Sequence, residues 1–422
     1  MKRDLLKIFA LLLLFTIVYG CCNPQEEQPK RAKYIFYFIG DGMGFSHVAL
    51  TEAYKAQLNG KEFGSDPLLF TQFPAMGMAT TYSASNPITC SSAAGTALST
   101  GSKTRNGFLG VTPDSVKLTS ISYKLHNAGY KVGVATTVTI DHATPGAFYA
   151  ASPDRNDYLT VALQLPKSGF EFFGGGGFQG AKPRKGDERS AQELNSLIFS
   201  AIDSAGYSVA YGMEDFKSKR ASGAEKVILF QSDSAKVNEI LPYALLRDSS
   251  DLTLTDVVTA AIEVLNNENG FFMMMEGGKI DWAAHSNDVA NTIYETLDMD
   301  EAIAVAYEFY KAHPEETLIV VTADHETGGV ALGREKGYFF DLHNILEQSK
   351  NASALGTNVE DYMKVTPVKE VSEESRIGWT THSHTGGAVP VFAVGAGSEA
   401  FIGRMDNTDI PKRICAAAGV EF

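Results

Sequence analysis

Six short runs of β-branched and aromatic residues, separated by helical patterns, constrain the possible folds of this chain more than any other feature. Most of these runs are apolar throughout, which is typical of strands that are covered on both faces. They span residues 34–39, 131–137, 226–231, 271–275, 317–322 and 389–394. Helical patterns lie between them, for example at residues 252–265 and 290–310. Strands that alternate with helices predict an α/β fold with a mostly parallel central sheet and helices on both faces.

Side chains that can bind metal follow four of the six runs. In sheets of this type, ligands bind beyond the carboxyl ends of the strands. In chain order, the side chains at these ends are Asp41, then Asp141, His142 and Thr144, then Glu276, then Asp324 and His325. We therefore predict that these strand ends lie together and that their side chains form one site.

The first residues have the features of a secretory signal. A basic start is followed by an apolar run at residues 8–19, which is too short for a comfortable membrane span, and by the small residue Gly20. Residues 18–21 resemble a bacterial lipobox, so cleavage would leave a lipidated Cys21 at the amino terminus. Simple secretion without a lipid is the alternative. We expect an exported protein of the periplasm or cell envelope.

The rest of the chain is expected to form one large domain. The expected division is a lipoprotein-type signal peptide at residues 1–20, a polar tether at 21–33 and a single domain at 34–422. Less regular stretches near residues 156–225 and 331–380 are interpreted as insertions around the rim of the site. The glycine-rich residues 173–180 are expected to form a flexible surface loop.

The formal net charge of −14 limits the classes of partner. A nucleic-acid-binding protein needs a basic surface, so this charge argues against that class. A phosphate substrate is still compatible with it, because bound divalent cations reverse the sign of the potential locally. The four cysteines show neither the density of a disulfide framework nor the spacing of a zinc finger.

The strongest local signal is formed by Glu276, Asp281 and His285. Asp281 and His285 are four residues apart, so they share one face of a helix. A carboxylate and an imidazole on one face suit a divalent ion such as zinc. Glu276, at the end of a strand, can face a second site that is rich in oxygen ligands. The alternative is a surface helix with a solvated Asp–His pair.

Two further segments offer pairs of ligands. Asp324 and His325 are adjacent at a strand end, and two glycines soon after them allow a close approach of the backbone. The alternative here is an ordinary polar exit from a strand. His382 and His384 lie on the same side of the chain if the segment is extended, so one or both could bind a metal.

Three single residues complete the candidate site. Asp41 lies between glycines that allow close metal approach, although a plain glycine turn has the same pattern. Ser91 precedes small residues at a helix start, where free amides and the helix dipole favour an alkoxide and a nearby phosphate; an N-cap serine is the alternative. Arg155 offers a planar fork for phosphate oxygens, or else forms a surface salt bridge.

Taken together, these motifs resemble the alkaline phosphatase family over residues 34–394. The motifs occur in the order of that family: the glycine-flanked Asp, the serine at a helix start, His-Ala-Thr-Pro with an arginine eleven residues after the threonine, Glu-x4-Asp-x3-His, Asp-His and His-Thr-Gly. The resemblance implies an alkaline phosphatase-like sandwich, and a phosphoric monoester hydrolase that uses a phosphoserine intermediate, two zinc ions and one magnesium ion.

The resemblance also implies roles for single residues. Ser91 corresponds to the nucleophile and Arg155 to the residue that clamps the phosphate. The corresponding ligands are Asp281, His285 and His384 for the first zinc; Asp41, Asp324 and His325 for the second zinc; and Asp41, Thr144 and Glu276 for magnesium.

The sequence departs from the family pattern at several positions. Cys90 replaces an Asp that precedes the serine in many members, which affects how Arg155 is oriented. Ser92 follows Ser91 where Ala is usual, so the nucleophile is open between two neighbouring serines. Two more variable positions, His142 and Trp282, are expected near the substrate or the magnesium ligands. The resemblance assigns no role to His382.

Other activities remain as alternatives. A sulfatase of the type that modifies a cysteine is disfavoured, because residues 90–94 lack the arginine of its motif. A phosphodiesterase on the same scaffold depends on pocket walls that the sequence does not reveal. A catalytically inactive metal-binding lipoprotein is disfavoured because all the transferable positions hold competent residues. The expected partners are small phosphorylated substrates and inorganic phosphate as product, and a homodimer is one assembly that the sequence allows.

Overall fold

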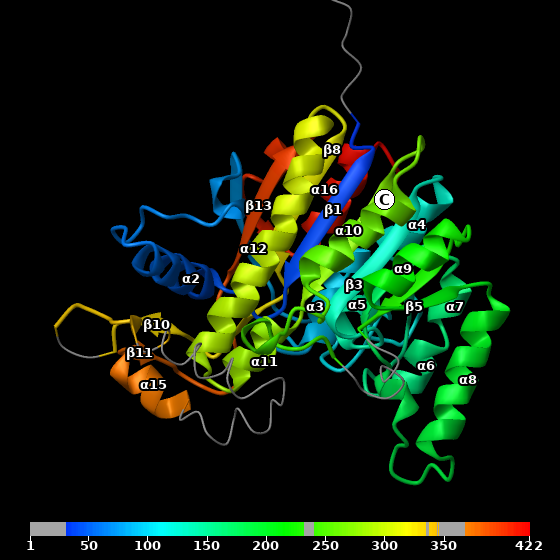
Figure 1. Ribbon diagram of the computed structural model, residues 1–422, viewed down its shortest axis with the longest axis horizontal. Coiled ribbons are helices and arrows are strands. Elements are labelled where there is room, and N and C mark those ends of the chain that lie inside the picture. Colours follow the sequence, from blue (N-terminus) through cyan, green and yellow to red (C-terminus); the bar gives the residue numbers. More distant parts are fainter. Residues whose placement is uncertain (1–30, 232–239, 335–336, 344, 346–367) are drawn as a thin grey trace, which may run out of the picture.

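A ten-stranded sheet lies at the centre of the computed structural model, which describes residues 31–231, 240–334, 337–343, 345 and 368–422 (Figure 1). The order of the strands is β14-β2-β13-β8-β1-β7-β3-β4-β6-β5. The strands span Tyr34–Gly40 (β1), Ala75–Thr80 (β2), Lys131–Thr139 (β3), Phe172–Gly176 (β4), Ser208–Tyr211 (β5), Val227–Phe230 (β6), Phe271–Gly277 (β7), Thr317–Ala323 (β8), Val389–Gly395 (β13) and Gly403–Asp406 (β14). The predicted signal peptide, and the tether as far as residue 30, lie outside the described residues.

The sheet is mostly parallel, which confirms the predicted fold class. All six predicted strands belong to it. β8, β1, β7, β3, β4, β6 and β5 pair in parallel with their neighbours, whereas β13 runs antiparallel to both β8 and β2. The central strands β1, β7 and β8 are buried along their whole length, as their continuous apolar sequences require.

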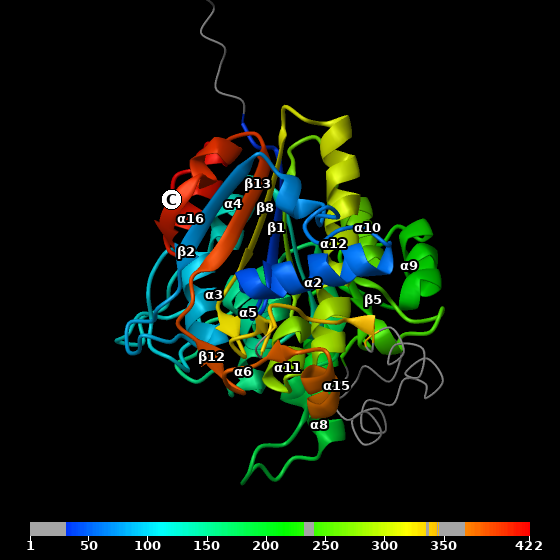
Figure 2. The ribbon, with the colours of Figure 1, turned by 90° about the vertical axis from the view of Figure 1, so that its left-hand side faces the viewer.

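Helices cover both faces of the sheet. Figure 2 shows α16, α4 and α3 on one side of the sheet, and α12, α10 and α9 on the other. The helices span Phe45–Leu58 (α2), Ser91–Thr100 (α3), Ile121–Asn127 (α4), Ala143–Tyr149 (α5), Tyr158–Ala162 (α6), Leu165–Ser168 (α7), Ala191–Ser204 (α8), Gly212–Ala221 (α9), Leu254–Leu265 (α10), Lys279–His285 (α11), Val289–Ala312 (α12), Val368–Glu374 (α15) and Asp409–Ala418 (α16). None of the helices in the described part of the chain combines the length and the apolar content that a membrane span requires.

The start of α10 shows how local sequence specifies these helices. The Thr253 hydroxyl accepts a hydrogen bond from the Asp256 amide at 3.0 Å, and the Asp256 carboxylate accepts one from the Thr253 amide at 3.0 Å. This reciprocal capping satisfies amides that have no partner within the helix. The buried residues Leu254, Val257 and Ala261 then place one face of α10 against the sheet.

The expectation of a flexible surface loop at residues 173–180 is wrong. The first half of this segment, residues 173–176, belongs to β4, a buried strand between β3 and β6. Its glycines are required by close packing. A Cβ atom on Gly174 would lie 2.7 Å from Cγ1 of Val257 in α10, and one on Gly175 would lie 2.7 Å from the carbonyl oxygen of Thr136. The predicted insertion at residues 156–225 therefore contains β4 and β5 of the central sheet as well as α6 to α9.

Replacing Gly174 with valine is expected to destabilise the protein by about 1–3 kcal/mol, because the new side chain would overlap Val257 of α10. Urea unfolding followed by circular dichroism would measure this as a lower midpoint. Alanine at the same position should cost less, since it adds only one carbon. An unchanged midpoint for the valine variant would show that α10 can move away from β4 without cost.

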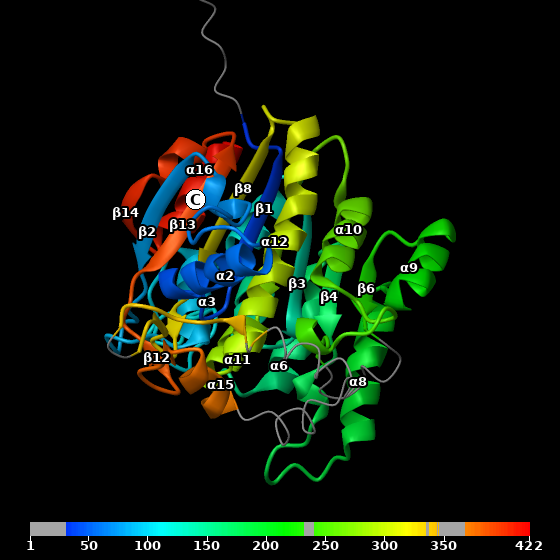
Figure 3. The ribbon, with the colours of Figure 1, turned by 60° about the vertical axis from the view of Figure 1, so that its left-hand side comes forward.

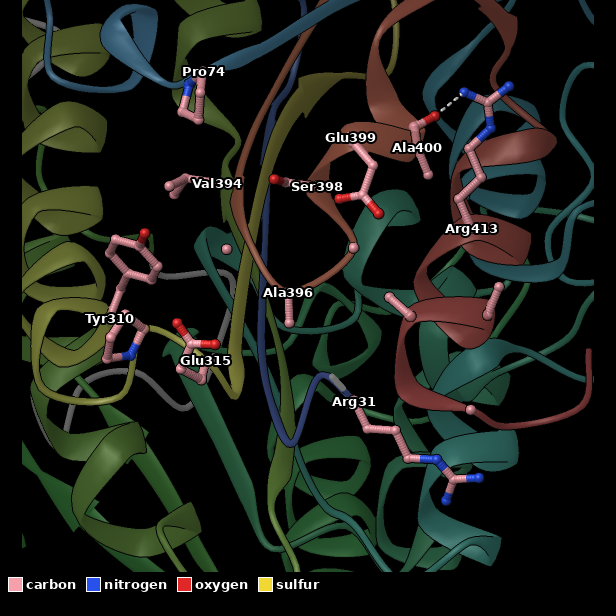
Figure 4. Close-up of a pocket in the computed structure, with 16 residues that line it drawn as sticks. Arg31, Pro74, Tyr310, Glu315, Val394, Ala396, Ser398, Glu399, Ala400 and Arg413 are labelled. Atoms are coloured by element: carbon pink, nitrogen blue, oxygen red, sulfur yellow. Dashed lines mark hydrogen bonds between the residues drawn. The ribbon is translucent and has the colours of Figure 1, made fainter. Parts of the chain in front are cut away.

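A cavity of about 810 Å³ opens at the amino ends of β1 and β8. Figure 4 shows Tyr310 and Glu315 on one side of it, and Arg31 and Arg413 on the other. None of the described residues that line this cavity belongs to the predicted site. It is separated from the carboxyl ends of the strands by the length of β1, roughly 23 Å for seven residues.

Candidate metal centre and active site

The carboxyl ends of β8, β1, β7 and β3 lie side by side, because these four strands are consecutive in the sheet. Gly40 at the end of β1 pairs with Gly277 of β7 and with Ala323 of β8. Asp41 therefore leaves the sheet between these two strands. Figure 3 shows α11 and β12 (His384–Thr385) at this same end of the sheet, opposite the end where the described chain begins.

Three groups of potential metal-binding side chains occur at this edge, and the ligand atoms within each group lie within 4.8 Å of one another. The groups are Asp281, His325 and His384; Asp41, Asp324 and His325; and Asp41, His142 and Glu276. His325 belongs to the first two groups and Asp41 to the last two, so the three form one continuous cluster. Among the predicted metal ligands, only Thr144 and His285 are not members of these groups.

Both of these residues lie next to the cluster. Nε2 of His285 is 3.1 Å from Nε2 of His384 and 3.4 Å from Oδ1 of Asp281. Thr144 is buried near the start of α5. Burial raises the pKa of Glu276, and the nearby side chain of Thr144 acts in the opposite direction. The structure therefore brings together the eight residues that the resemblance matched to metal ligands, whereas His382, the other possible ligand, lies outside these groups with its Nδ1 at the His285 carbonyl.

A short strand pair brings His384 to His325. β9 (Glu326–Thr327) pairs with β12, with His384 opposite Thr327, and the rings of His325 and His384 stack at 3.6 Å between centroids. Thr327 is a residue of this site that was not predicted from the sequence: its hydroxyl donates to Oδ1 of Asp281 at 2.5 Å and lies 3.2 Å from Nδ1 of His325. Its signal was its position two residues after His325, since alternate residues of a strand share a face.

The carboxylates of the cluster are buried and close together. Burial raises the pKa of Asp324 to about 8 and that of Glu276 to about 7, and the neighbouring charge of Asp281 acts in the same direction. Burial and then the charge of Asp324 raise the pKa of Asp41 well above its usual value. Both Asp41 oxygens, Oδ2 of Asp324 and Oε1 of Glu276 are buried without a hydrogen bond. Such a group of acceptors is stable as anions only beside positive charge.

Ser91 is the serine that faces this cluster. It is the first residue of α3, and its Oγ lies 3.3 Å from Nε2 of His325. Oγ of Ser92 instead lies 3.2 Å from Sγ of Cys90. Of the two neighbouring serines, Ser91 is therefore the one whose hydroxyl lies beside the metal-binding groups.

Close packing of α3 against α5 places Ser91 and Thr144 at the same site. A Cβ atom on Gly95 would lie 3.2 Å from Cβ of Ala147 and 3.4 Å from Cα of Thr144. Glycine at this position therefore lets the two helices approach each other closely, and a larger residue would separate the serine from the ligands on α5.

Arg155 lies close enough to the cluster to act on it electrostatically. Its positive charge contributes to the lowered pKa values of His325 and His384, although burial is the main cause for both. Its backbone amide donates to the Gly107 carbonyl at 2.8 Å, which anchors the loop after α5 to the loop after α3. The neighbouring Asp154 pairs with Arg184 at 2.9 Å.

His142 and Trp282 pack together at the edge of the third group. Their rings are 5.9 Å apart in an edge-to-face arrangement. Burial, and then the charge of Arg155, lower the pKa of His142 to about 3, so this imidazole is neutral and one of its ring nitrogens has a free lone pair that can bind a metal ion. Its side chain belongs to the group with Asp41 and Glu276.

Known proteins share both the sequence and the architecture described above. A model of the family described as "Alkaline phosphatase" matches residues 32–174 and 216–420. The chain belongs to the alkaline phosphatase family. This confirms the predicted enzyme class and the resemblance from which it was inferred. The part between the matched ranges, residues 175–215, falls within the predicted insertion.

Individual alkaline phosphatases match the chain over almost its full length. Alkaline phosphatase 4 of Bacillus subtilis is 31% identical, and the match covers 97% of this chain and 95% of that protein. The alkaline phosphatase of the Antarctic bacterium TAB5 is 28% identical, with a TM-score of 0.72 over 94% of this chain and all of that one. The cold-active alkaline phosphatase of a psychrophilic Shewanella is also 28% identical, with a TM-score of 0.77 over 91% of this chain and 99% of its own.

Proposed function

We propose that this alkaline phosphatase hydrolyses phosphate monoesters through a phosphoserine on Ser91, at a site for two zinc ions and one magnesium ion. The observation that carries the proposal is the position of Ser91 Oγ, 3.3 Å from Nε2 of His325 and next to a buried cluster of carboxylates and imidazoles. A serine at a helix start without such a cluster would be an ordinary N-cap.

The side chains of the cluster fit the proposed ions. The first zinc would be held by Asp281, His285 and His384, the second by Asp41, Asp324 and His325, and magnesium by Asp41, Thr144 and Glu276. Mixed nitrogen and oxygen donors suit zinc, and an all-oxygen set suits magnesium. The carboxyl oxygens that have no hydrogen bond support this assignment. A variant of the TAB5 enzyme has been solved with magnesium in its M3 site.

When bound, the cations supply positive charge that favours the Ser91 alkoxide and the charge that develops on the ester oxygens. Oγ of Ser91 attacks phosphorus, the bond between phosphorus and the alcohol oxygen breaks, and the phosphoryl group stays on Ser91. Water then cleaves the phosphoserine and releases inorganic phosphate. Arg155 pairs with non-bridging phosphate oxygens and holds the phosphorus in line with Oγ.

Trapping the phosphoserine tests the proposal directly. The protein is incubated with a phosphate monoester, quenched in acid and digested, and the phosphorylated peptide is identified by mass spectrometry. We expect phosphate on Ser91. Turnover without any phosphorylated serine would contradict a covalent route, and a phosphate on Ser92 would contradict the assignment of the nucleophile. Comparing the rates on phenyl phosphate and on the matching diester would test the preference for monoesters.

Replacing Arg155 with alanine is expected to lower kcat/KM for phosphate monoesters by roughly 10²-fold, because a charged donor to the transferred group is lost. Inhibition by inorganic phosphate should weaken as well. Arg184→Ala is a suitable control, since this arginine pairs with Asp154 on the exposed surface. Equal kinetics for wild type and the Arg155 variant would mean that this side chain does not bind phosphate.

Export and anchoring complete the proposal for the protein in the cell. Residues 1–20 would act as a signal peptide, with Cys21 lipidated and residues 21–33 as a tether to a single catalytic domain at 34–422. Metabolic labelling with a fatty acid tests whether Cys21 is lipidated, and the label should be lost in a Cys21→Ala variant. Gel filtration with light scattering tests whether the enzyme is a homodimer.

A further inference from the structure

His382 has no role in the mechanism above, yet it lies in a firmly held connection. It falls between β11 (Ile377–Gly378) and β12, two residues before the ligand His384. The Gly328 carbonyl accepts hydrogen bonds from the amides of Thr380 and Thr381 at 2.9 and 3.1 Å, and the Gly328 amide donates to the Ser383 carbonyl at 2.9 Å. The backbone is therefore fixed on both sides of His382.

His382 and His285 form a reciprocal pair of hydrogen bonds. Nδ1 of His285 lies 2.6 Å from the backbone oxygen of His382, and Nδ1 of His382 lies 3.0 Å from the backbone oxygen of His285. Both acceptors are carbonyls, so each imidazole carries its proton on Nδ1 in this arrangement. We call this pair the histidine clasp.

The clasp has a direct consequence for the proposed first zinc site. Since Nδ1 of His285 donates to a carbonyl, the lone pair of its Nε2 is free, and this nitrogen faces His384 and Asp281 at 3.1 and 3.4 Å. A partner that fixes the second nitrogen of a histidine ligand also fixes the orientation of the ring toward the metal.

The same contact joins the two segments that carry the imidazoles of the first site. His285 is the last residue of α11, and His384 begins β12. In the described structure β12 pairs with β9, and α11, as a helix, lies outside the sheets. The clasp therefore connects two elements whose relative position decides the distance between two proposed ligands.

We propose that His382 is a positioning residue for the first metal site: its side chain closes the histidine clasp, which holds His285 and His384 at the separation that a zinc ion requires. The inference rests on the proposed metal centre. Any variant at position 382 keeps the backbone carbonyl that accepts from His285. Only the side chain of His382 supplies the second hydrogen bond, from its Nδ1 to the His285 carbonyl, which holds the two residues together.

A simple capping role gives a different expectation. The carbonyl of His285 is one of the last four in α11, which have no partner within the helix, so a donor there stabilises the helix end. If His382 acts only as a cap, its loss lowers the stability of the metal-free protein and leaves the zinc affinity unchanged. If it positions the ligands, the zinc affinity falls.

The test is a zinc titration of metal-stripped protein against a chromophoric chelator, for wild type and for the His382→Ala, His382→Asn and His126→Ala variants. The asparagine variant can place an amide donor near the position of Nδ1. His126 is a matched control, because its imidazole also contacts a neighbour, Glu171 at 3.5 Å, but lies at the opposite end of the sheet. The thermal midpoint of each metal-free protein is measured alongside.

We expect His382→Ala to weaken one of two zinc equivalents by about 10-fold or more, with the asparagine variant returning toward wild type and His126→Ala unchanged. Activity of the alanine variant should recover at high zinc concentration. An unchanged zinc affinity in His382→Ala, or an equal loss in the alanine and asparagine variants, would overturn the inference. If the wild-type protein itself binds no zinc, the proposed metal centre fails, which is a separate and recognisable result.

Discussion

Replacing Ser91 with alanine is expected to reduce phosphate monoester turnover by about 10³-fold or more. The substitution removes the oxygen that lies 3.3 Å from Nε2 of His325 and leaves the remaining catalytic groups in place. Alanine is a good helix former, so α3 should persist and the fold should be retained. Steady-state kinetics on phenyl phosphate, together with circular dichroism, would measure both effects.

The neighbouring serine provides the matched control. Ser92 is fully buried in the same helix, and its hydroxyl contacts Sγ of Cys90 rather than the metal-binding cluster. Ser92→Ala is therefore expected to keep most of the activity. The reverse pattern, with an active Ser91 variant and an inactive Ser92 variant, would mean that the nucleophile is the second serine and that the start of α3 is rotated in solution.

Removal of divalent ions is expected to abolish activity and to destabilise the fold. The cluster places the carboxylates of Asp41, Asp324 and Glu276 out of contact with water, and their repulsion is uncompensated without cations. An ion that binds only the folded state stabilises it by about 4 kcal/mol at a thousand times its dissociation constant. Dialysis against a chelator should therefore eliminate turnover and lower the thermal midpoint.

Adding metals back separates the proposed sites. Zinc and magnesium together should restore full activity and the original thermal midpoint, whereas magnesium alone should not, because a site with imidazole ligands prefers zinc. In a control sample, the same ions are added to the protein before it is dialysed against the chelator. This control shows whether the chelator itself damages the enzyme. Full activity in a protein shown by elemental analysis to contain no metal would refute the metal-dependent mechanism.

Much of this architecture could be predicted because the central strands are continuous apolar runs. Tyr34–Gly40 is buried on both faces, so its sequence carries no alternation, and the ligands follow directly at its end. The antiparallel direction of β13 could not be predicted, since an apolar run has the same pattern in either direction. β4 was missed because a strand rich in glycine has the composition of a turn, and the contacts with Val257 and Thr136 that explain its glycines exist only in the folded protein.

The chemistry of the site was easier to predict than its supporting contacts. Asp281 and His285 were recognisable from their spacing of four residues, which depends only on helix geometry. Thr327 and His382 act through partners that are distant in the sequence, and these pairings exist only once β9, β12 and α11 have packed together. Their spacing of two residues from His325 and from His384 could have marked them as neighbours of the site, but it does not reveal these distant partners.

The position at which the described chain enters the sheet has a practical consequence. Arg31 lies beside the amino end of β1, and the groups of the candidate site lie beyond its carboxyl end. A bilayer anchor, an affinity label or a solid support joined upstream of Arg31 would therefore attach on the side remote from the reaction. Immobilised in this way, the enzyme would expose the candidate site at the carboxyl ends of the strands to the bulk solution. Dissolved esters could then reach the site and phosphate could diffuse away unhindered.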